Sequence, residues 1–268
     1  MISAKRYIKQ TEDALPTVSE TLSKQDMISR ISYLYRYVLV QRLILPGESV
    51  MILDCGCGDG ILLDFLDSQA YQNVFYVGVD ISKRKISYAR TRSPKFIRNV
   101  HYVIADVEYL PFRDKSFNIV TLIEVLEHIP KPHFCLKEIA RILKDKLIVT
   151  TPSAFAPKKN DILSMVYPIM AILDIPPRKR ETFITIQNRH LWHRDFTRSE
   201  LIGLLSSSFE VVHLQSFGFI VAVLIAKILK IFSANVASKM LYCIENCLSQ
   251  LPVLRYSGYT WLVCLKKK

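Results

Sequence analysis

The chain has 268 residues, of which 50% are hydrophobic and 22% charged, so it can bury a sizeable core and is too apolar for a disordered tail or linker. The formal net charge is +12. Most of the excess lies in residues 151–268, with 15 basic and 7 acidic side chains, whereas residues 51–150 carry 14 and 12. A basic and apolar C-terminal part indicates a membrane surface or a lipid-like partner at least as readily as nucleic acid.

The N-terminal residues predict a helical lid, residues 1–46, in front of one larger domain. Lys24–Leu45 has a helical pattern that ends at Pro46-Gly47. Residues 1–10 carry basic side chains but no apolar core of signal-peptide length, which predicts a cytoplasmic protein. The 6 cysteines do not form two Cys-x-x-Cys units, so reduced thiols are expected.

From Val50 onward, short β-branched runs alternate with helical patterns, as in a parallel sheet covered by helices. The expected strands are Val50–Asp54, Val74–Asp80, Val100–Ala105, Phe117–Ile123 and Lys146–Thr150. The expected helices between them are Ile61–Ser68, Lys83–Arg92 and Phe134–Leu143. Because crossover connections are right-handed, these repeats predict a doubly wound α/β sheet.

The C-terminal part predicts two more strands and two insertions, so residues 47–268 form one domain interrupted at about 152–196 and 218–257. The first insertion is an irregular stretch in which Asp161–Ile175 could form a short helix. Thr197 and Glu200 then predict a capping box at a helix start. The remaining expected elements are strands at Phe209–Phe217 and Tyr259–Leu265, with helices at Phe219–Phe232 and Ala237–Leu248 between them.

A glycine-rich turn follows the first expected strand, in the sequence Asp54-Cys55-Gly56-Cys57-Gly58-Asp59-Gly60. Glycines allow positive φ and let a ligand approach the backbone at a helix start. The spacing departs from the dinucleotide pattern G-x-G-x-x-G, because Ile61 stands where the third glycine belongs. An acid before the glycines repels a pyrophosphate and attracts an ammonium group.

Two further acids end the next strands. Asp80 is placed to accept both hydroxyls of a ribose, and Asp106 to accept a hydrogen bond from the amino group of a base. Three acids at the carboxyl ends of successive strands fit an adenosine that carries an amino acid better than a dinucleotide.

These residues, together with Glu124-Val125-Leu126-Glu127-His128-Ile129, resemble the class I S-adenosylmethionine-dependent methyltransferases of the small-molecule type 11 branch. The resemblance covers about Leu45 to Thr151. It implies a mostly parallel seven-stranded sheet with an antiparallel last strand, and S-adenosyl-L-methionine as cofactor. By the same resemblance Asp54, Gly56 and Gly58 hold the methionine end, Asp80 the ribose, Asp106 and Val107 the adenine, and Glu124 lies near the methionine moiety. The predicted cofactor set is Asp54, Gly56, Cys57, Gly58, Gly60, Asp80, Ile81, Asp106, Val107 and Glu124.

Methyl transfer from a sulfonium needs alignment, and it needs a base only when the acceptor must lose a proton. The candidate bases are Glu127 and His128 after the fourth strand, and His190 and His193 in the first insertion. A packing or capping role is the alternative for each. A metal site built from His128, His133, His190 and His193 has no helical spacing and no accompanying acid, so no metal is expected.

The favoured function is methyl transfer from S-adenosylmethionine to a hydroxyl or carbon of a small or lipid-linked acceptor. The alternatives are an RNA or protein methyltransferase and a non-catalytic, membrane-associated subunit that binds the cofactor. Nucleic acid is disfavoured because no separate RNA-binding module is visible. The apolar and basic extensions predict peripheral contact with a membrane surface or, failing that, helices packed on each other or on a second copy in a homodimer.

Overall fold

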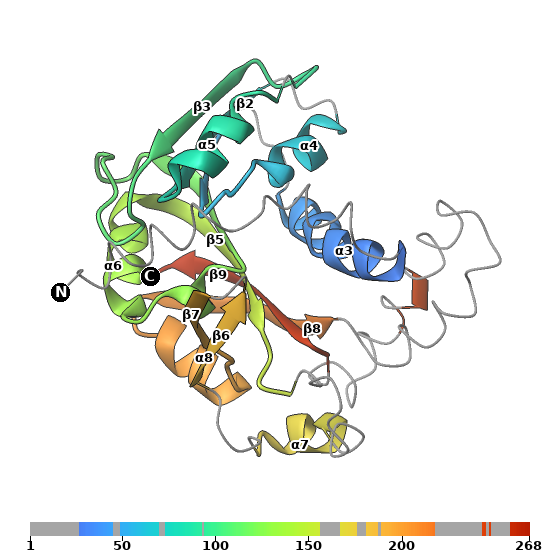
Figure 1. Cartoon of the computed structure of the whole chain (residues 1–268). Helices are drawn as coiled ribbons and strands as arrows, with labels where there is room; N and C mark the ends of the chain where they lie inside the picture. Colours follow the sequence, from blue (N-terminus) through green and yellow to red (C-terminus); the bar gives the residue numbers. More distant parts are fainter. Residues whose placement is uncertain are drawn as a thin grey trace.

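The computed structural model describes residues 27–44, 49–69, 73–92, 94–155, 167–175, 181–186, 189–217, 243–244, 247 and 258–268. A seven-stranded sheet runs through this part of the chain, with helices on both faces (Figure 1). Its strands are β1 (Val50–Cys55), β2 (Val74–Asp80), β3 (Asn99–Ile104), β4 (Phe117–Ile123), β5 (Leu143–Pro152), β8 (Phe209–Phe217) and β9 (Thr260–Lys267). The helices are α3 (Met27–Leu43), α4 (Ile61–Asp67), α5 (Lys83–Ala89), α6 (Pro132–Ile142), α7 (Tyr167–Leu173) and α8 (Arg198–Leu205), with a 3₁₀ turn η1 (Leu126–His128).

The strand order is β3-β2-β1-β4-β5-β9-β8. β1 pairs in parallel with both β2 and β4, whereas β9 runs antiparallel to β5 and β8. The predicted doubly wound sheet with an antiparallel last strand is therefore confirmed. The order reverses between β1 and β4, and the carboxyl ends of strands at such a switch point are where open α/β sheets bind ligands.

Alternation along the buried strands sends side chains to two separate cores. On β1, Ile52 joins the core beneath α3 and α4, while Leu53 joins the core beneath α6 and α8. In the first core Tyr37 of α3 stacks on Phe65 of α4, with ring centroids 5.5 Å apart. A second contact joins α3 to the sheet: the Lys146 ammonium of β5 donates to the Leu43 carbonyl at 2.8 Å. The stacking and this hydrogen bond together hold the predicted N-terminal helix against the sheet.

The first insertion is more regular than the sequence pattern indicates. Within residues 152–196 the strands β6 (Glu181–Ile186) and β7 (Arg189–Arg194) form a separate antiparallel pair, and α7 precedes them. The pattern failed here because a two-stranded hairpin with charged residues lacks the apolar alternation of a sheet strand. Thr197 caps α8 through the predicted capping box with Glu200. The helices expected at Phe219–Phe232 and Ala237–Leu248 lie outside the described residues, apart from positions 243, 244 and 247.

Candidate active site

The glycine turn lies between the end of β1 and the start of α4. Gly56, Gly58 and Gly60 all have positive φ, at 73°, 55° and 80°. A Cβ on Gly56 would meet Val125 Cγ2 at 2.3 Å, and one on Gly60 would meet the Tyr102 hydroxyl at 2.5 Å, so both glycines are packed against protein. A Cβ on Gly58 would meet nothing within 4 Å. The turn therefore leaves open space over Gly58 alone among its three glycines.

Asp80, at the end of β2, is hydrogen-bonded to this turn. One carboxylate oxygen accepts the Gly58 backbone N–H at 2.9 Å, and the other accepts the Ser82 N–H at 2.8 Å. The side chain of Ser82 in turn caps α5 by accepting from the Lys85 N–H. A carboxylate with two oxygens has lone pairs left for a ligand hydroxyl. Ile81, which follows Asp80, is half-buried, and Cys57 is buried in the turn.

Asp54 is buried beneath the turn with 3% of its surface exposed. Its carboxylate accepts hydrogen bonds from the Tyr76 and Thr121 hydroxyls, each at 2.7 Å. Burial raises the pKa of this carboxyl to about 6, although both hydroxyl donors oppose the shift. A buried acid with a raised pKa at the end of a strand is characteristic of a functional site.

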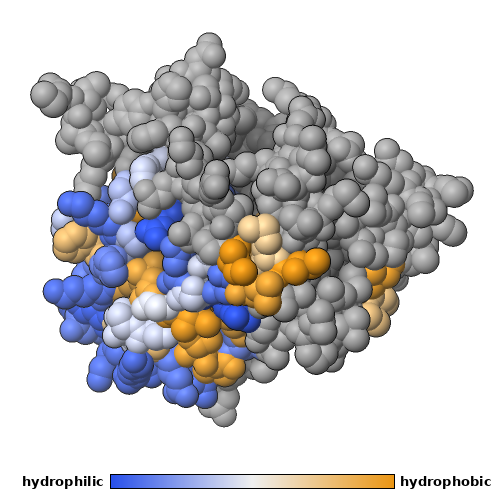
Figure 2. Space-filling view, turned by 90° about the horizontal axis from the view of Figure 1, so that it is seen from below, coloured by the Kyte–Doolittle hydropathy of each residue, from blue (hydrophilic) through white to orange (hydrophobic). Residues whose placement is uncertain are grey.

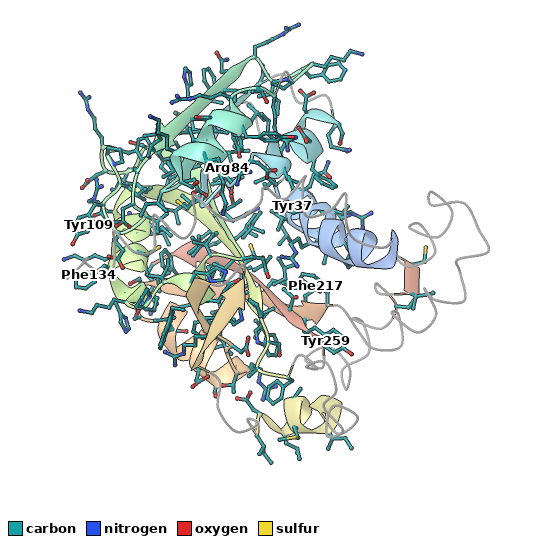
Figure 3. The ribbon with its side chains drawn as sticks, in the orientation of Figure 1. Tyr37, Arg84, Tyr109, Phe134, Phe217 and Tyr259 are labelled. Atoms are coloured by element: carbon teal, nitrogen blue, oxygen red, sulfur yellow. The ribbon has the colours of Figure 1, made fainter. Side chains whose placement is uncertain are left out.

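The Asp106 loop after β3 is shaped by its own side chain. The carboxylate accepts the Glu108 N–H at 2.9 Å, and the Asp106 carbonyl accepts the Tyr109 N–H. Asp106 and Val107 are both half-buried, as expected for residues that edge a binding site. Tyr109 follows them with 67% of its surface exposed, and Figure 3 shows it at the outer side of this loop.

Glu124 directly follows β4 and has a positive φ of 53°, an uncommon backbone conformation for a residue with a side chain. One carboxylate oxygen accepts from the Thr150 hydroxyl at 3.0 Å, and the other pairs with the Arg36 guanidinium at 2.9 Å. Arg36 comes from α3, and the sequence analysis missed it. Only the topology brings α3 to the switch point, and the position of this arginine between two tyrosines is the one local signal in the sequence.

Glu127 is buried, with 1% of its surface exposed, and accepts from the Thr151 hydroxyl at 3.2 Å. Burial and the neighbouring Glu124 raise the pKa of Glu127 well above its ordinary value. A carboxyl so enclosed has no surface to offer an acceptor. Its Oε1 lies 4.0 Å from Nε2 of His128.

His128 is the exposed member of this group, with 27% of its side chain accessible. Its Nδ1 lies 3.1 Å from the Trp192 carbonyl oxygen on β7. A carbonyl only accepts, so this contact assigns the proton to Nδ1 and leaves Nε2 with its lone pair. β7 also places the His193 ring 5.3 Å from the His128 ring, measured between centroids.

Two other histidines, His133 and His190, are candidates from the sequence. His133 is exposed on α6, and His190 lies on β7 opposite Thr185. Among the described residues no group of three or more histidines, cysteines and acids is arranged to hold a metal ion.

The strand order, the glycine turn over an acid and the acid ending β2 together define the class I methyltransferases. Residues 53–149 match the family model of the methyltransferase domain. Residues 53–149 are thus similar to a methyltransferase domain, in agreement with the resemblance to the class I, type 11 enzymes, and S-adenosyl-L-methionine is the cofactor that this resemblance implies.

Curated relatives carry the name ubiquinone biosynthesis O-methyltransferase. The protein from Coxiella burnetii (strain Dugway 5J108-111) is 35% identical over 104 residues, which is 39% of this chain and 42% of the relative. The protein from Hahella chejuensis is 32% identical over 138 residues, 51% of this chain and 56% of the relative. The chain thus spans about half the length of the curated relatives it matches.

Solved structures share the fold over most of the chain. A protein of Pyrococcus horikoshii OT3 superimposes with a TM-score of 0.59 at 20% identity, over 97% of this chain and 99% of that one. A SAM-dependent methyltransferase of Methanosarcina mazei gives 0.56 at 19% identity, over 85% and 96%.

The residues present fit the cofactor. The open space over Gly58 and the carboxylate of Asp80 beside the turn suit a nucleoside at this place. The Glu124–Arg36 ion pair places groups of both signs after β4, and the ammonium and carboxylate of a methionine group could exchange partners with them. This fit adds Arg36 to the residues expected to hold the cofactor.

Proposed function

We propose that the protein transfers the methyl group of S-adenosyl-L-methionine to a hydroxyl oxygen of a small-molecule acceptor, with His128 as general base. The observation that carries the proposal is the tautomer of His128, whose Nδ1–H faces the Trp192 carbonyl so that Nε2 is the basic atom beside the cofactor residues. The names of the curated relatives support oxygen as the methylated atom.

The residues then act as follows. When bound, S-adenosylmethionine supplies an electrophilic methyl group. His128 Nε2 takes the proton from the acceptor hydroxyl as its oxygen forms the new bond to carbon, so the oxygen does not develop a positive charge. The resulting imidazolium faces the Glu127 carboxyl at 4.0 Å and keeps its Nδ1–H on the Trp192 carbonyl. Asp80, Glu124 and Arg36 align the donor, which supplies most of the acceleration in a displacement reaction.

A labelled-methyl transfer assay against fractionated lipid, metabolite and RNA extracts tests the function. We expect label in hydroxyl-bearing small molecules, released as a base-stable ether. His128→Gln should lower kcat about 100-fold or more, the usual contribution of a general base, while calorimetry shows unchanged cofactor affinity. His101→Gln, which removes an exposed histidine on β3, is the matched control.

Label recovered only in RNA or protein would replace the proposal by one of its alternatives. The absence of S-adenosylmethionine binding would reject the small-molecule, RNA and protein methyltransferase functions together. Full activity in His128→Gln would show that the acceptor loses its proton elsewhere.

We further propose that the acceptor is lipid-linked and reached at a membrane surface. α7 and the residues after it expose three apolar side chains, Ile169, Leu173 and Ile175, by 53–61%. Figure 2 views the molecule from the side on which α7 lies and shows hydrophobic side chains at the surface. Among the described helices none is long and apolar enough to cross a membrane. A basic chain with an exposed apolar helix suits contact with anionic headgroups.

Vesicle flotation tests this contact. We expect the protein to float with anionic vesicles, less so at high salt, and the combined change Ile169→Ser, Leu173→Ser and Ile175→Ser to lower the bound fraction several-fold. Val212→Ser, which removes an equally exposed apolar side chain from β8, is the matched control. Protein that stays in the soluble fraction with every vesicle composition would refute the contact while leaving the methyl-transfer assay unaffected.

A further inference from the structure

A second imidazole beside His128 carries features that methyl transfer with His128 as base does not use. His193 Nε2 lies 2.9 Å from the Asp195 carboxylate oxygen Oδ1. A carboxylate only accepts, so Nε2 carries the proton and Nδ1 is left with its lone pair. Nδ1 is buried and has no hydrogen-bond partner in the described part of the chain. Buried polar atoms are nearly always satisfied, so an acceptor nitrogen left without a donor indicates a missing ligand.

The pair is held rigidly at the candidate active site. Asp195 immediately precedes Phe196, whose N–H donates to the Pro152 carbonyl at the end of β5. The Phe196 carbonyl accepts from the Ala154 N–H at 2.9 Å and from the Trp261 indole N–H at 2.8 Å. Three hydrogen bonds, to the end of β5, to the segment just after it and to β9, therefore fix the backbone next to the carboxylate, as a preorganised site requires.

His193 and His128 face one another from two different elements. Their ring centroids are 5.3 Å apart, with the planes inclined at 55°. His128 has its N–H on a backbone carbonyl, and His193 has its N–H on a carboxylate. Each imidazole is thus held in a tautomer that leaves one nitrogen able to accept. Two such nitrogens close together form a surface that selects molecules with hydrogens to donate.

We propose that His193 is an acceptor-binding residue: its Nδ1 accepts a hydrogen bond from a hydroxyl group of the methyl acceptor, and Asp195 is the positioning residue that holds the proton of the neutral ring on Nε2. The assignment rests on the proposed function and adds to it a selection rule. Acceptors that present O–H at this position bind, and their methyl ethers do not.

Nitrogen-detected NMR of the imidazoles tests the tautomer without any acceptor. In the wild-type protein at pH 8, we expect His193 to be protonated at Nε2 and bare at Nδ1. Asp195→Asn removes the carboxylate that accepts the Nε2–H at 2.9 Å and should let the Nδ1–H tautomer appear. Among the residues that the structure describes, the titratable groups near the ring include Asp195, His128 and, beyond it, Glu127. Asp145→Asn, which removes an exposed carboxylate on β5, is the matched control and should leave His193 unchanged.

The ligand contact is tested with phenol, which donates a hydrogen bond, and with its methyl ether anisole, which does not. In the presence of S-adenosylhomocysteine, phenol should shift the Nδ1 resonance of wild-type His193 and anisole should not. Both wild-type measurements stand even where Asp195→Asn fails to fold. A proton on Nδ1, equal responses to the two probes, or no response to phenol would overturn the proposal.

The methyl-transfer reaction and the binding role of His193 can be rejected independently of each other. With an acceptor identified by labelled-methyl transfer, His193→Phe should raise KM at least tenfold with a smaller change in kcat, whereas His128→Gln acts on kcat. A failed transfer assay with a positive phenol response would reject the reaction and keep the hydroxyl-binding site. Unchanged KM in His193→Phe would reject the binding role and keep the reaction.

Discussion

Gly58→Ala is expected to weaken cofactor binding about 10- to 100-fold at a modest cost in stability, whereas Gly56→Ala should destabilise the turn more strongly. A Cβ on Gly58 enters the open space in which the ligand would lie, and no protein atom stands within 4 Å of it. The positive φ of 55° costs a side chain about 1–2 kcal/mol, which lowers Tm by a few degrees. Crowding a bound ligand by one methyl costs about 1–3 kcal/mol, or about 10- to 100-fold in affinity.

The glycine pair is its own control. A Cβ on Gly56 would lie 2.3 Å from Val125 Cγ2, so this variant adds a clash to the same backbone strain, and the expected loss of stability is about 2–4 kcal/mol. Calorimetry with S-adenosylmethionine and thermal unfolding of both variants separate the two effects. Wild-type affinity in Gly58→Ala would place the cofactor away from the turn, and equal stability of the two variants would show that the turn is not packed as described.

The cofactor half of the site could be predicted from sequence because each residue stands at a strand end. Asp80 and Glu124 follow buried β-branched runs, and parallel strands bring their carboxyl ends to one edge. The register that pairs Asp54 with Gly78 and Thr121 then follows from burial of alternate side chains.

The acceptor half could be predicted only as a set of candidates. His128 and His193 are separated by 65 positions, and their contact depends on the β6–β7 hairpin, whose pairing leaves no period-2 apolar pattern. Arg36 is brought to Glu124 by the packing of α3, which rests on the stacking of Tyr37 and Phe65. The tautomers of both histidines are set by a backbone carbonyl and by Asp195, and no sequence pattern encodes a tautomer.

Asp54→Asn is expected to stabilise the fold at neutral pH and to weaken cofactor binding. Burial raises the pKa of Asp54 from the ordinary 3.8 to about 6, so between these values the folded state binds more protons than the unfolded state. The contribution of Asp54 is therefore most favourable below pH 4 and is lost as pH rises through 6. Two pH units correspond to about 3 kcal/mol, which the ionised carboxylate costs the fold at pH 7.

Asparagine stands in for the protonated acid, because its amide oxygen still accepts from Thr121 or Tyr76 and it carries no charge. Denaturant unfolding at pH 4 and pH 7.5 should show the variant close to wild type at pH 4 and more stable by about 2–3 kcal/mol at pH 7.5. The difference in stability between the two proteins isolates the effect of Asp54 from that of carboxyls whose pKa shifts in the opposite direction. One of these is Asp67, whose pKa is lowered by backbone hydrogen bonds.

Measurements of cofactor affinity show whether the ionised Asp54 carboxylate, which destabilises the fold, contributes to binding. A carboxylate kept ionised beneath the turn attracts the positive sulfonium and ammonium groups of S-adenosylmethionine, so wild-type affinity should fall about tenfold between pH 7.5 and pH 5, while the affinity of Asp54→Asn stays flat and low. S-adenosylhomocysteine, which lacks the sulfonium charge, should show the smaller pH dependence of the two ligands. A variant that gains stability and keeps wild-type affinity at pH 7.5 would show that Asp54 serves the packing of Tyr76 and Thr121 alone.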